Sequence, residues 1–325
     1  MTGRGSDDGV LLGVDVGGTS MSAGIVTRDG RVLVTRGRPT HGPEGGGAIE
    51  RILGLAAEVL ALPAARRQRL AGVGAGLPGL VDVASGTVGG EAHHVPELVG
   101  VPMAKLLAEV AGAPAFVDND VNALALAEGR WGAGRGAKSF VLLAVGTGVG
   151  GGMVLDGRLH RGAGGFGGEL GHVPIAFDGR ACICGARGCL KAYVAGPDLA
   201  GEASRRLGRP VDTAGLFELA DRGDATAEAV VAEATEALAA GLAIIVNGIN
   251  PERLLVAGSV GQAFARREGD LRARLARRAY KDALATTRLA FLDLGKDSSV
   301  RGGAALVLYE REQASRASSS PPHPG

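Results

Sequence analysis

One arrangement of apolar runs and glycine turns occurs twice in this chain of 325 residues. The first copy begins with an apolar run at residues 10–16 and turns at Gly17-Gly18-Thr19. It continues as two runs separated by Asp29-Gly30. The second copy repeats the run, the glycine turn and the Asp-Gly pair over residues 139–161. Because an Asp-Gly pair between apolar runs favours a hairpin, each copy is expected to form a three-stranded meander. The repetition predicts a duplicated architecture.

Helical and strand-like segments follow each meander, and their alternation predicts an α/β protein. The longest apolar helix pattern ends at Asn247-Gly248, with Pro251 soon after, as helix C-termini often do. The expected helices are 48–60, 103–111, 121–128, 225–246 and 300–310, and the expected strands between them are 70–76, 115–117 and 253–257.

The length of the chain favours two lobes. We expect an N-terminal lobe at 9–127, which the helix 300–311 is a candidate to complete, and a C-terminal lobe at 128–299. The polar ends 1–8 and 313–325 have the composition of disordered tails.

The formal net charge is +1, so nothing in the charge balance predicts nucleic acid or a membrane surface as a partner. No unbroken apolar stretch approaches the ~18 residues of a membrane span, and the first ten residues lack the apolar region of a signal peptide. A cytoplasmic protein is the simplest interpretation. Apolar residues make up 46% of the chain, enough for two substantial cores.

The glycine turns are candidate phosphate sites, because a strand that stops at glycines aims several backbone N–H groups at one point. Asp15 precedes the first turn and is placed to orient Mg²⁺, which takes one or two carboxylates together with phosphate oxygens. The alternative is that the glycines serve only as turns, although their repetition disfavours it. The predicted phosphate-binding residues are Asp15, Gly17, Gly18, Thr19, Gly146, Thr147, Gly148 and Gly258.

A dinucleotide-binding fold is the rival interpretation, because residues 146–151 match G-x-G-x-x-G. That motif requires a helix directly after the glycines. A hairpin is expected here instead, and the first glycine turn does not match the motif.

All three cysteines lie close together, as Cys182, Cys184 and Cys189. An odd number at such short spacing argues for a metal site rather than for disulfides. Tetrahedral zinc needs a fourth donor, and His172 is the natural candidate ten residues upstream. Four protein ligands leave no open position, so the predicted zinc is structural. Unligated cysteines in a surface loop remain the alternative.

Several motifs together resemble known proteins. The run Val14–Thr19 resembles the first phosphate motif of sugar kinases with the actin/hexokinase-like ATPase fold. The segments 146–152, 169–172 and 182–189 resemble the ROK family of repressors, open reading frames and kinases. Over about 10–311, the resemblance implies two lobes built from a duplicated βββαβαβα domain, with ATP and a sugar in the cleft between them. It also implies a homo-oligomer, either a dimer or a tetramer.

Three polar residues, Asp118, Asn119 and Asp120, follow a short strand and enter a helix. Helix capping explains one such residue but not three. A kinase needs a carboxylate near the attacking hydroxyl to accept its proton. The resemblance implies that Asn119 holds the sugar and that Asp120 is the catalytic base. Asp118 is expected to be structural.

Glu169 and His172 are three residues apart, so they are able to share one helical face and hold sugar hydroxyls. If zinc occupies one ring nitrogen of His172, the other is able to face the sugar. The alternative for Glu169 is a solvated acid at a helix start. ROK sugar kinases usually have a sugar-binding Glu after the last cysteine and one further residue, where this chain has Lys191. An Asn that often precedes a proline in the family is also missing from residues 91–96. One interpretation is that Lys191 faces an altered sugar, such as an amino sugar. The other is that it turns to solvent and a water replaces the Glu.

The function expected from the resemblance is transfer of the γ-phosphate of ATP to the primary (6-) hydroxyl of a hexose or hexose derivative, such as glucose or an amino sugar. The expected cofactors are ATP, Mg²⁺ and structural Zn²⁺. A sugar-sensing repressor is disfavoured, because only nine residues precede the first strand and no basic patch is evident. A catalytically weak, sugar-binding regulatory protein is the remaining alternative, and Lys191 motivates it.

Overall fold

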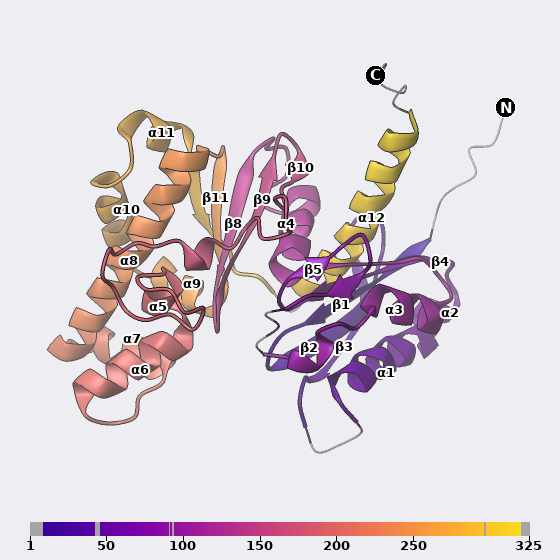
Figure 1. The fold of residues 1–325 in the computed structure, drawn as a ribbon, viewed down its shortest axis with the longest axis horizontal. Helices are drawn as coiled ribbons and strands as arrows, with labels where there is room; N and C mark the ends of the chain where they lie inside the picture. The colour runs from indigo at the N-terminus through magenta and orange to yellow at the C-terminus, as the bar shows by residue number, and fades with distance from the viewer. Residues whose placement is uncertain (1–8, 43–45, 91, 93, 296, 320–325) are drawn as a thin grey trace. The chain divides into compact units, whose positions relative to one another are not determined.

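The computed structural model describes residues 9–42, 46–90, 92, 94–295 and 297–319. These divide into two compact units (Figure 1). Unit 1 takes its residues from Met1–Arg135 and Gly295–Gly325, and unit 2 is Gly136–Leu294. The boundary expected between the lobes, after residue 127, falls inside the helix Asp120–Trp131. This helix lies wholly in unit 1.

Unit 1 is built on a five-stranded sheet in the order β3-β2-β1-β4-β7. The first three strands form an antiparallel meander, and β4 and β7 continue parallel to β1. A separate pair, β5 (Val81–Asp82) and β6 (Thr87–Val88), lies outside this sheet. The sheet strands are β1 (Val10–Val16), β2 (Ser20–Val26), β3 (Val32–Pro39), β4 (Leu70–Leu77) and β7 (Ala115–Asn119).

Helices pack against both faces of this sheet, so its parallel part is buried on both sides. On one face are α1 (Ala48–Ala61) and α3 (Met103–Ala111), and on the other α4 (Asp120–Trp131) and α12 (Ser298–Ser319). Unit 1 also contains the short helices α2 (Pro63–Arg66) and η1 (Pro96–Leu98).

The C-terminal helix approaches the sheet through glycines. A Cβ at Gly13 of β1 would lie 1.8 Å from the carbonyl oxygen of Val300, and one at Gly74 of β4 would lie 1.9 Å from that of Gly303. No side chain fits in that space, so these two strand glycines set how closely α12 packs. Because side chains alternate along a strand, Asp15 shares the α12 face of β1 with Gly13.

Unit 2 repeats this topology, with a sheet in the order β10-β9-β8-β11-β12. Again three antiparallel strands form a meander, and two further strands run parallel to the first. The predicted α/β fold with a duplicated architecture is therefore confirmed. The strands are β8 (Phe140–Val145), β9 (Val149–Leu155), β10 (Arg158–Leu159), β11 (Arg253–Ala257) and β12 (Arg288–Phe291).

The core of unit 2 is organised around α8 (Ala225–Ile249). Its length and mean hydropathy of 1.9 over 18 residues would allow a membrane span, but 67% of that window is buried inside the unit. Packing as a core helix accounts for its apolar sequence. The other helices are η2 (Leu170–His172), α5 (Lys191–Val194), α6 (Gly196–Leu207), α7 (Thr213–Asp221), α9 (Ser259–Ala265), α10 (Glu268–Ala276) and α11 (Lys281–Thr286).

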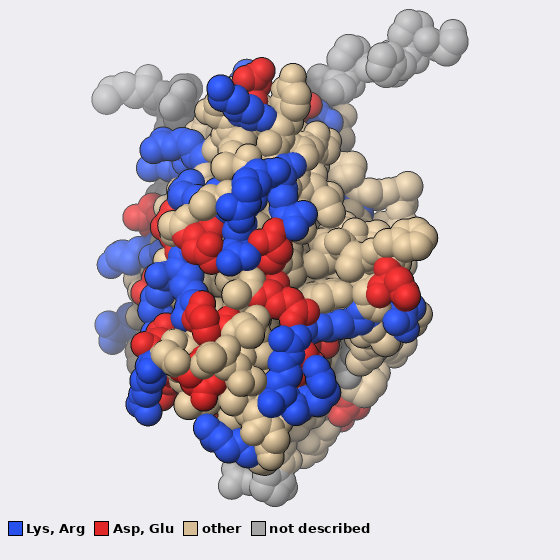
Figure 2. Space-filling view, turned by 90° about the vertical axis from the view of Figure 1, so that its left-hand side faces the viewer, with Lys and Arg blue, Asp and Glu red and all other residues tan. Residues whose placement is uncertain are grey.

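Charged side chains of both signs are interspersed on the face shown in Figure 2. Ion pairs join charged residues of unit 2, among them Arg274 and Arg278 with Glu236, and Arg267 with Glu228. This mixture matches the nearly balanced charge of the whole chain.

The C-terminal helix is longer than expected. Residues 313–319, expected to be disordered, continue α12 to Ser319, while 1–8 and 320–325 lie outside the described residues. Arg, Glu, Gln and Ala are frequent at the end of α12, and all favour helix even on an exposed surface. A polar composition was therefore wrongly taken as a sign of disorder.

Candidate functional site

The first glycine turn joins β1 to β2 and is closed by its own backbone. Gly17 donates its N–H to the carbonyl oxygen of Ser20 at 2.9 Å, so this amide is not available to a phosphate. The buried hydroxyl of Thr40 donates to the carbonyl of Gly17 at 2.7 Å, and the Thr40 N–H donates to that of Thr19 at 3.0 Å. Thr40, which the sequence analysis missed, thus anchors the turn.

His94 packs against the same turn, because a Cβ at Gly18 would lie 2.6 Å from the Cβ of His94. This contact explains why residue 18 has no side chain. The neighbouring Glu91 and His93 lie outside the described residues.

Asp15 lies at the end of β1, one residue before the Val16-Gly17 entry to the turn. Its side chain hydrogen-bonds with Ser299, and Ser299 also bonds with Ser22 at 3.0 Å between their hydroxyl oxygens. Burial raises the pKa of Asp15 to about 6, and the Ser299 hydrogen bond offsets part of that rise. A carboxylate held out of water beside a glycine turn is suited to a cation or its waters.

The polar run after β7 has divided roles. Asn119 is the N-cap of α4: its Oδ1 accepts the N–H groups of Val121 at 2.9 Å and Asn122 at 3.3 Å. Its Nδ2 donates to the carbonyl of Gly79 at 3.2 Å, which leaves one amide hydrogen for a ligand. Asn119, predicted to bind the sugar, is therefore also the helix cap.

Asp118 is buried, and its Oδ1 accepts the Asn119 N–H at 2.7 Å and the Nδ2 of Asn122 at 2.9 Å. This supports the structural role expected for Asp118. Asp120 begins α4, and its Oδ1 accepts the N–H of Val121 at 2.8 Å. A Cβ at Gly76 would come within 3.0 Å of the Asp120 Cα, so the end of β4 packs directly on this residue.

The second glycine turn lies between β8 and β9, and a hairpin follows it, which excludes the dinucleotide-binding interpretation. Gly146 donates its N–H to Gly148 at 2.9 Å, and its carbonyl accepts the N–H of Gly196 at 2.8 Å. Gly258 packs beside the turn with φ +92°, where an added Cβ would lie 2.4 Å from the Val145 carbonyl. The three predicted glycines 146, 148 and 258 thus converge in unit 2.

A cavity of about 740 Å³ opens beside this turn. The starts of α6 and α7 and one side of α9 form its walls, which combine apolar surface with hydroxyl, amide and guanidinium groups. Its size and mixed lining suit a small organic ligand. Only Gly146 and Thr147 were predicted from sequence. The lining residues are Gly146, Thr147, Gly196, Pro197, Ala200, Asp212, Thr213, Ala214, Phe217, Ser259, Val260, Gln262, Ala263 and Arg266.

The three cysteines and His172 meet as predicted, with their ligand atoms within 4.8 Å of one another. The His172 Nδ1 lies 3.6 Å from the Cys182 Sγ, and the Sγ atoms of Cys184 and Cys189 are 3.8 Å apart. Tetrahedral zinc with bonds of about 2.1–2.3 Å places its ligand atoms roughly 3.5–3.8 Å apart. These residues therefore fit a structural zinc site, with Nδ1 as the nitrogen ligand.

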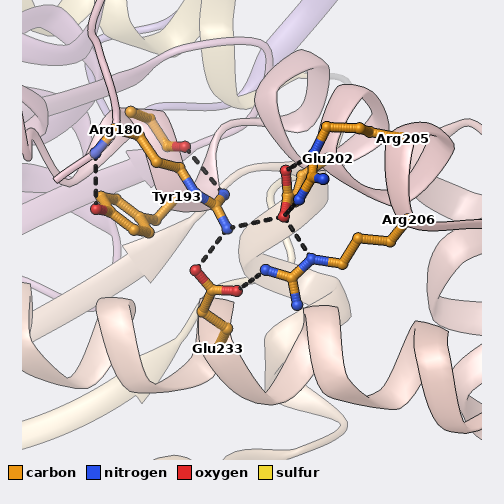
Figure 3. Close-up of polar contacts among 7 residues, drawn as sticks. Arg180, Tyr193, Glu202, Arg205, Arg206 and Glu233 are labelled. Carbon is orange, nitrogen blue, oxygen red and sulfur yellow. Dashed lines mark hydrogen bonds and ion pairs between the residues drawn. The ribbon is translucent and has the colours of Figure 1, made fainter.

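Arg180 lies in the loop before the cysteines, and its side chain contacts residues of α5, α6 and α8 (Figure 3). It forms ion pairs with Glu233 of α8 at 2.6 Å and Glu202 of α6 at 3.6 Å, and its guanidinium carbon lies 4.6 Å from the centre of the Tyr193 ring. Arg206 also pairs with both glutamates. These contacts fix α5, α6 and α8 relative to the cysteine loop.

The remaining predicted sugar residues differ in their surroundings. Glu169 is exposed and precedes the single turn η2, which carries His172. Residues three apart in such a turn lie on one side of it, so Glu169 and His172 are neighbours. The third residue, Lys191, donates its Nζ to the Asp198 Oδ2 at 2.8 Å.

Two sheets of like topology, each with a glycine turn in its first hairpin, define an α/β protein of the actin/hexokinase-like ATPase class. Within that class, the chain belongs to the ROK family, whose model matches residues 11–310. The expected family membership is thus confirmed.

Comparison with known proteins gives close relatives of full length. The chain is 32% identical to a glucokinase from Thermotoga maritima over 311 residues, which cover 91% of this chain and 96% of the relative. It is similar to the structure of a ROK hexokinase from Thermus thermophilus, with 35% identity, a TM-score of 0.79, and coverage of 94% of this chain and 99% of that one. A ROK glucokinase from Streptomyces griseus, solved with glucose and AMPPNP, gives 28% identity and a TM-score of 0.75, covering 93% and 100%.

Proposed function

We propose that this protein is an ATP-dependent sugar kinase that transfers the γ-phosphoryl group to the primary hydroxyl of a hexose or hexose derivative. The observation that carries the proposal is the cavity of about 740 Å³ beside Gly146 and Thr147, which has room for a nucleoside next to a glycine turn. Membership of the ROK family and similarity to glucokinases over nearly the whole chain support it.

In this proposal the base and sugar of ATP occupy the cavity of unit 2, with the apolar wall at Phe217 and Pro197 and the polar wall at Thr213 and Gln262. The phosphates lie at the backbone of Thr147 and Gly148, with Gly258 allowing close approach. Mg²⁺, when bound, neutralises phosphate charge. In unit 1, Asp15 is the residue proposed to orient Mg²⁺ or its waters, and Gly18 and Thr19 are the residues proposed to bind phosphate.

Asp120 is the proposed catalytic base. Its carboxylate accepts the proton of the attacking hydroxyl as that oxygen bonds to the γ-phosphorus and the bond to the bridging oxygen breaks, releasing ADP. One Asp120 oxygen accepts the Val121 N–H at 2.8 Å, which helps to orient the carboxylate at the start of α4. A fixed carboxylate at a helix start contributes by position more than by basicity.

Asn119, Glu169 and His172 are the proposed sugar ligands. The remaining amide hydrogen of Asn119 is a donor, the Glu169 carboxylate is an acceptor, and the Nε2–H of His172 is a donor once zinc occupies Nδ1. A sugar hydroxyl both donates and accepts, so each of these groups is able to hold one. Glucose and amino sugars are the hexoses to test first.

ADP release tests the proposal directly. Purified protein with Mg-ATP should release ADP with at least one of glucose, mannose, glucosamine, N-acetylglucosamine and N-acetylmannosamine. The product should resist further phosphorylation and carry phosphate on the primary hydroxyl, as NMR of the sugar would show. Sugar binding without turnover on any of these would favour the regulatory alternative instead.

We also propose that the protein is a homo-oligomer, as the ROK resemblance implies. Light scattering coupled to size-exclusion chromatography should give a mass of two or four chains of 32.6 kDa. A mass of a single chain at micromolar concentration would contradict this.

A further inference from the structure

Lys191 is the first residue of α5, two positions after the metal-binding Cys189. Its Nζ donates to the Oδ2 of Asp198 at 2.8 Å, and the two side chains are 17% and 28% exposed. Both alternatives weighed from the sequence, a Lys191 facing the sugar and one facing solvent, omit this partner. The ammonium is instead paired across the junction of α5 and α6.

That junction forms part of the wall of the nucleotide cavity. Gly196, at its centre, donates its N–H to the carbonyl of Gly146 at 2.8 Å and accepts the Thr213 hydroxyl at 2.8 Å. A Cβ at Gly196 would lie 3.2 Å from the Thr213 Oγ1, so the contact is close. The junction therefore holds both the second glycine turn and the start of α7.

Asp198 lies in the first turn of α6, two residues after Gly196. Its carboxylate is favourably placed near the N–H groups of that turn and also accepts the ammonium. The pair therefore ties the first turn of α5 to the first turn of α6. The Arg180 guanidinium donates to the carbonyl of Ala192 at 3.3 Å, and the Arg180 backbone N–H donates to the Tyr193 hydroxyl at 3.0 Å (Figure 3). These two bonds anchor α5 to the cysteine loop.

The geometry points to Lys191 as a positioning residue for the nucleotide rather than a ligand of the sugar. The Lys191–Asp198 ion pair sets the junction at Gly196, and through it the Gly146 turn and the Thr213 wall of the cavity. This inference rests on the proposed function, since it assigns the cavity to ATP. Lys191 stands where ROK sugar kinases usually have a sugar-binding Glu. In this inference it helps to determine the affinity of the protein for ATP.

Direct binding measurements test the inference separately from turnover. The Kd of a fluorescent ATP analogue with Mg²⁺ is measured for wild type, Lys191→Met, Asp198→Asn and the double variant. The Kd of the preferred sugar is measured for the same proteins in a separate titration. We expect each single variant to weaken nucleotide binding about fivefold and to leave the sugar Kd within about twofold. Because both changes remove one interaction, the double variant should be no weaker than the single ones.

Lys105→Met is the matched control, since Lys105 is an exposed lysine of α3 in unit 1 that pairs with Glu109 at 4.0 Å. It should change neither Kd. Exchange of the pair, Lys191→Asp with Asp198→Lys, should recover at least half of the lost nucleotide affinity. Circular dichroism melts identify any variant that has failed to fold. If a single variant fails to fold, the nucleotide Kd of the exchanged pair is compared with that of wild type instead.

A sugar Kd that shifts while the nucleotide Kd does not would overturn the inference, as would a Lys191→Glu variant that binds glucose more tightly with unchanged nucleotide affinity. Wild-type protein that binds the nucleotide analogue but phosphorylates none of the sugars would contradict the proposed function. In that case the nucleotide Kd values of the variants still decide the role of Lys191.

Discussion

Ser299, at the start of the C-terminal helix, hydrogen-bonds with Asp15 at the end of the first strand. The same hydroxyl lies 3.0 Å from that of Ser22, the cross-strand neighbour of Asp15. The last helix of the chain therefore completes the surroundings of a carboxylate beside the first glycine turn. Ser22 and Ser299 are 277 residues apart in the sequence, and they meet because α12 packs on β1 and β2.

Asp15→Asn should stabilise the protein while impairing its use of Mg-ATP. Burial raises the Asp15 pKa from 3.8 to about 6, so the native state binds this proton more tightly than the unfolded state does. Wild-type stability should therefore fall as the pH rises from about 4 through about 6. Above that range the variant should be more stable by roughly 1–2 kcal/mol, since Asn carries no charge to bury.

Urea unfolding without nucleotide, at low and at neutral pH, measures this difference. It should shrink as the pH falls below 3.8, where Asp15 becomes protonated in both states. Asp156→Asn, a change in an exposed turn, serves as control. A variant that is less stable than wild type at neutral pH would contradict the prediction. It would show that interactions in the folded protein offset the cost of burying the Asp15 charge.

Gly13→Ala should be severely destabilising, by about 3 kcal/mol or more, because its Cβ would lie 1.8 Å from the Val300 carbonyl and force α12 off the sheet. Gly201→Ala is the contrast, since Gly201 is an exposed residue of α6 with open space at the Cβ position. There Ala should stabilise by about 0.5–1 kcal/mol. Thermal melts of both variants test the pair, and equal effects would contradict the packing described for α12.

Cys184→Ser should remove bound zinc and lower the melting temperature, because three ligands hold the ion less tightly than four. Metal analysis by mass spectrometry should find about one zinc per wild-type chain. Cys184 is exposed, so the substitution itself leaves little cavity. A wild-type protein purified without chelators that contains no zinc would remove the metal site from this account.

Much of this architecture could be predicted because its signals are local in sequence. Two glycine turns, each followed by an Asp-Gly hairpin, specify a repeated meander, and the spacing of three cysteines specifies a metal loop. The walls of the cavity in unit 2 gave no such signal. Pro197, Thr213 and Gln262 lie on three different helices, and only the tertiary packing of unit 2 brings them to Gly146.

Two roles could not be read from residue type alone. Asn119 is both a helix cap and a candidate ligand, and sequence offers no way to count the hydrogen bonds its amide has left. Lys191 finds Asp198 seven residues later, across a break between two helices, where no helical periodicity predicts a contact. In both cases the chemistry of the side chain was clear, but its partner was set by packing.

The most direct test of the central claim is ADP release by Asp120→Asn compared with wild type, at saturating Mg-ATP and sugar. Loss of the carboxylate should lower kcat by about a thousandfold, while the Kd of the sugar changes little. Asp156→Asn should retain wild-type kcat. An Asp120→Asn protein that keeps more than about a tenth of the wild-type kcat would contradict the assignment of Asp120 as the catalytic base.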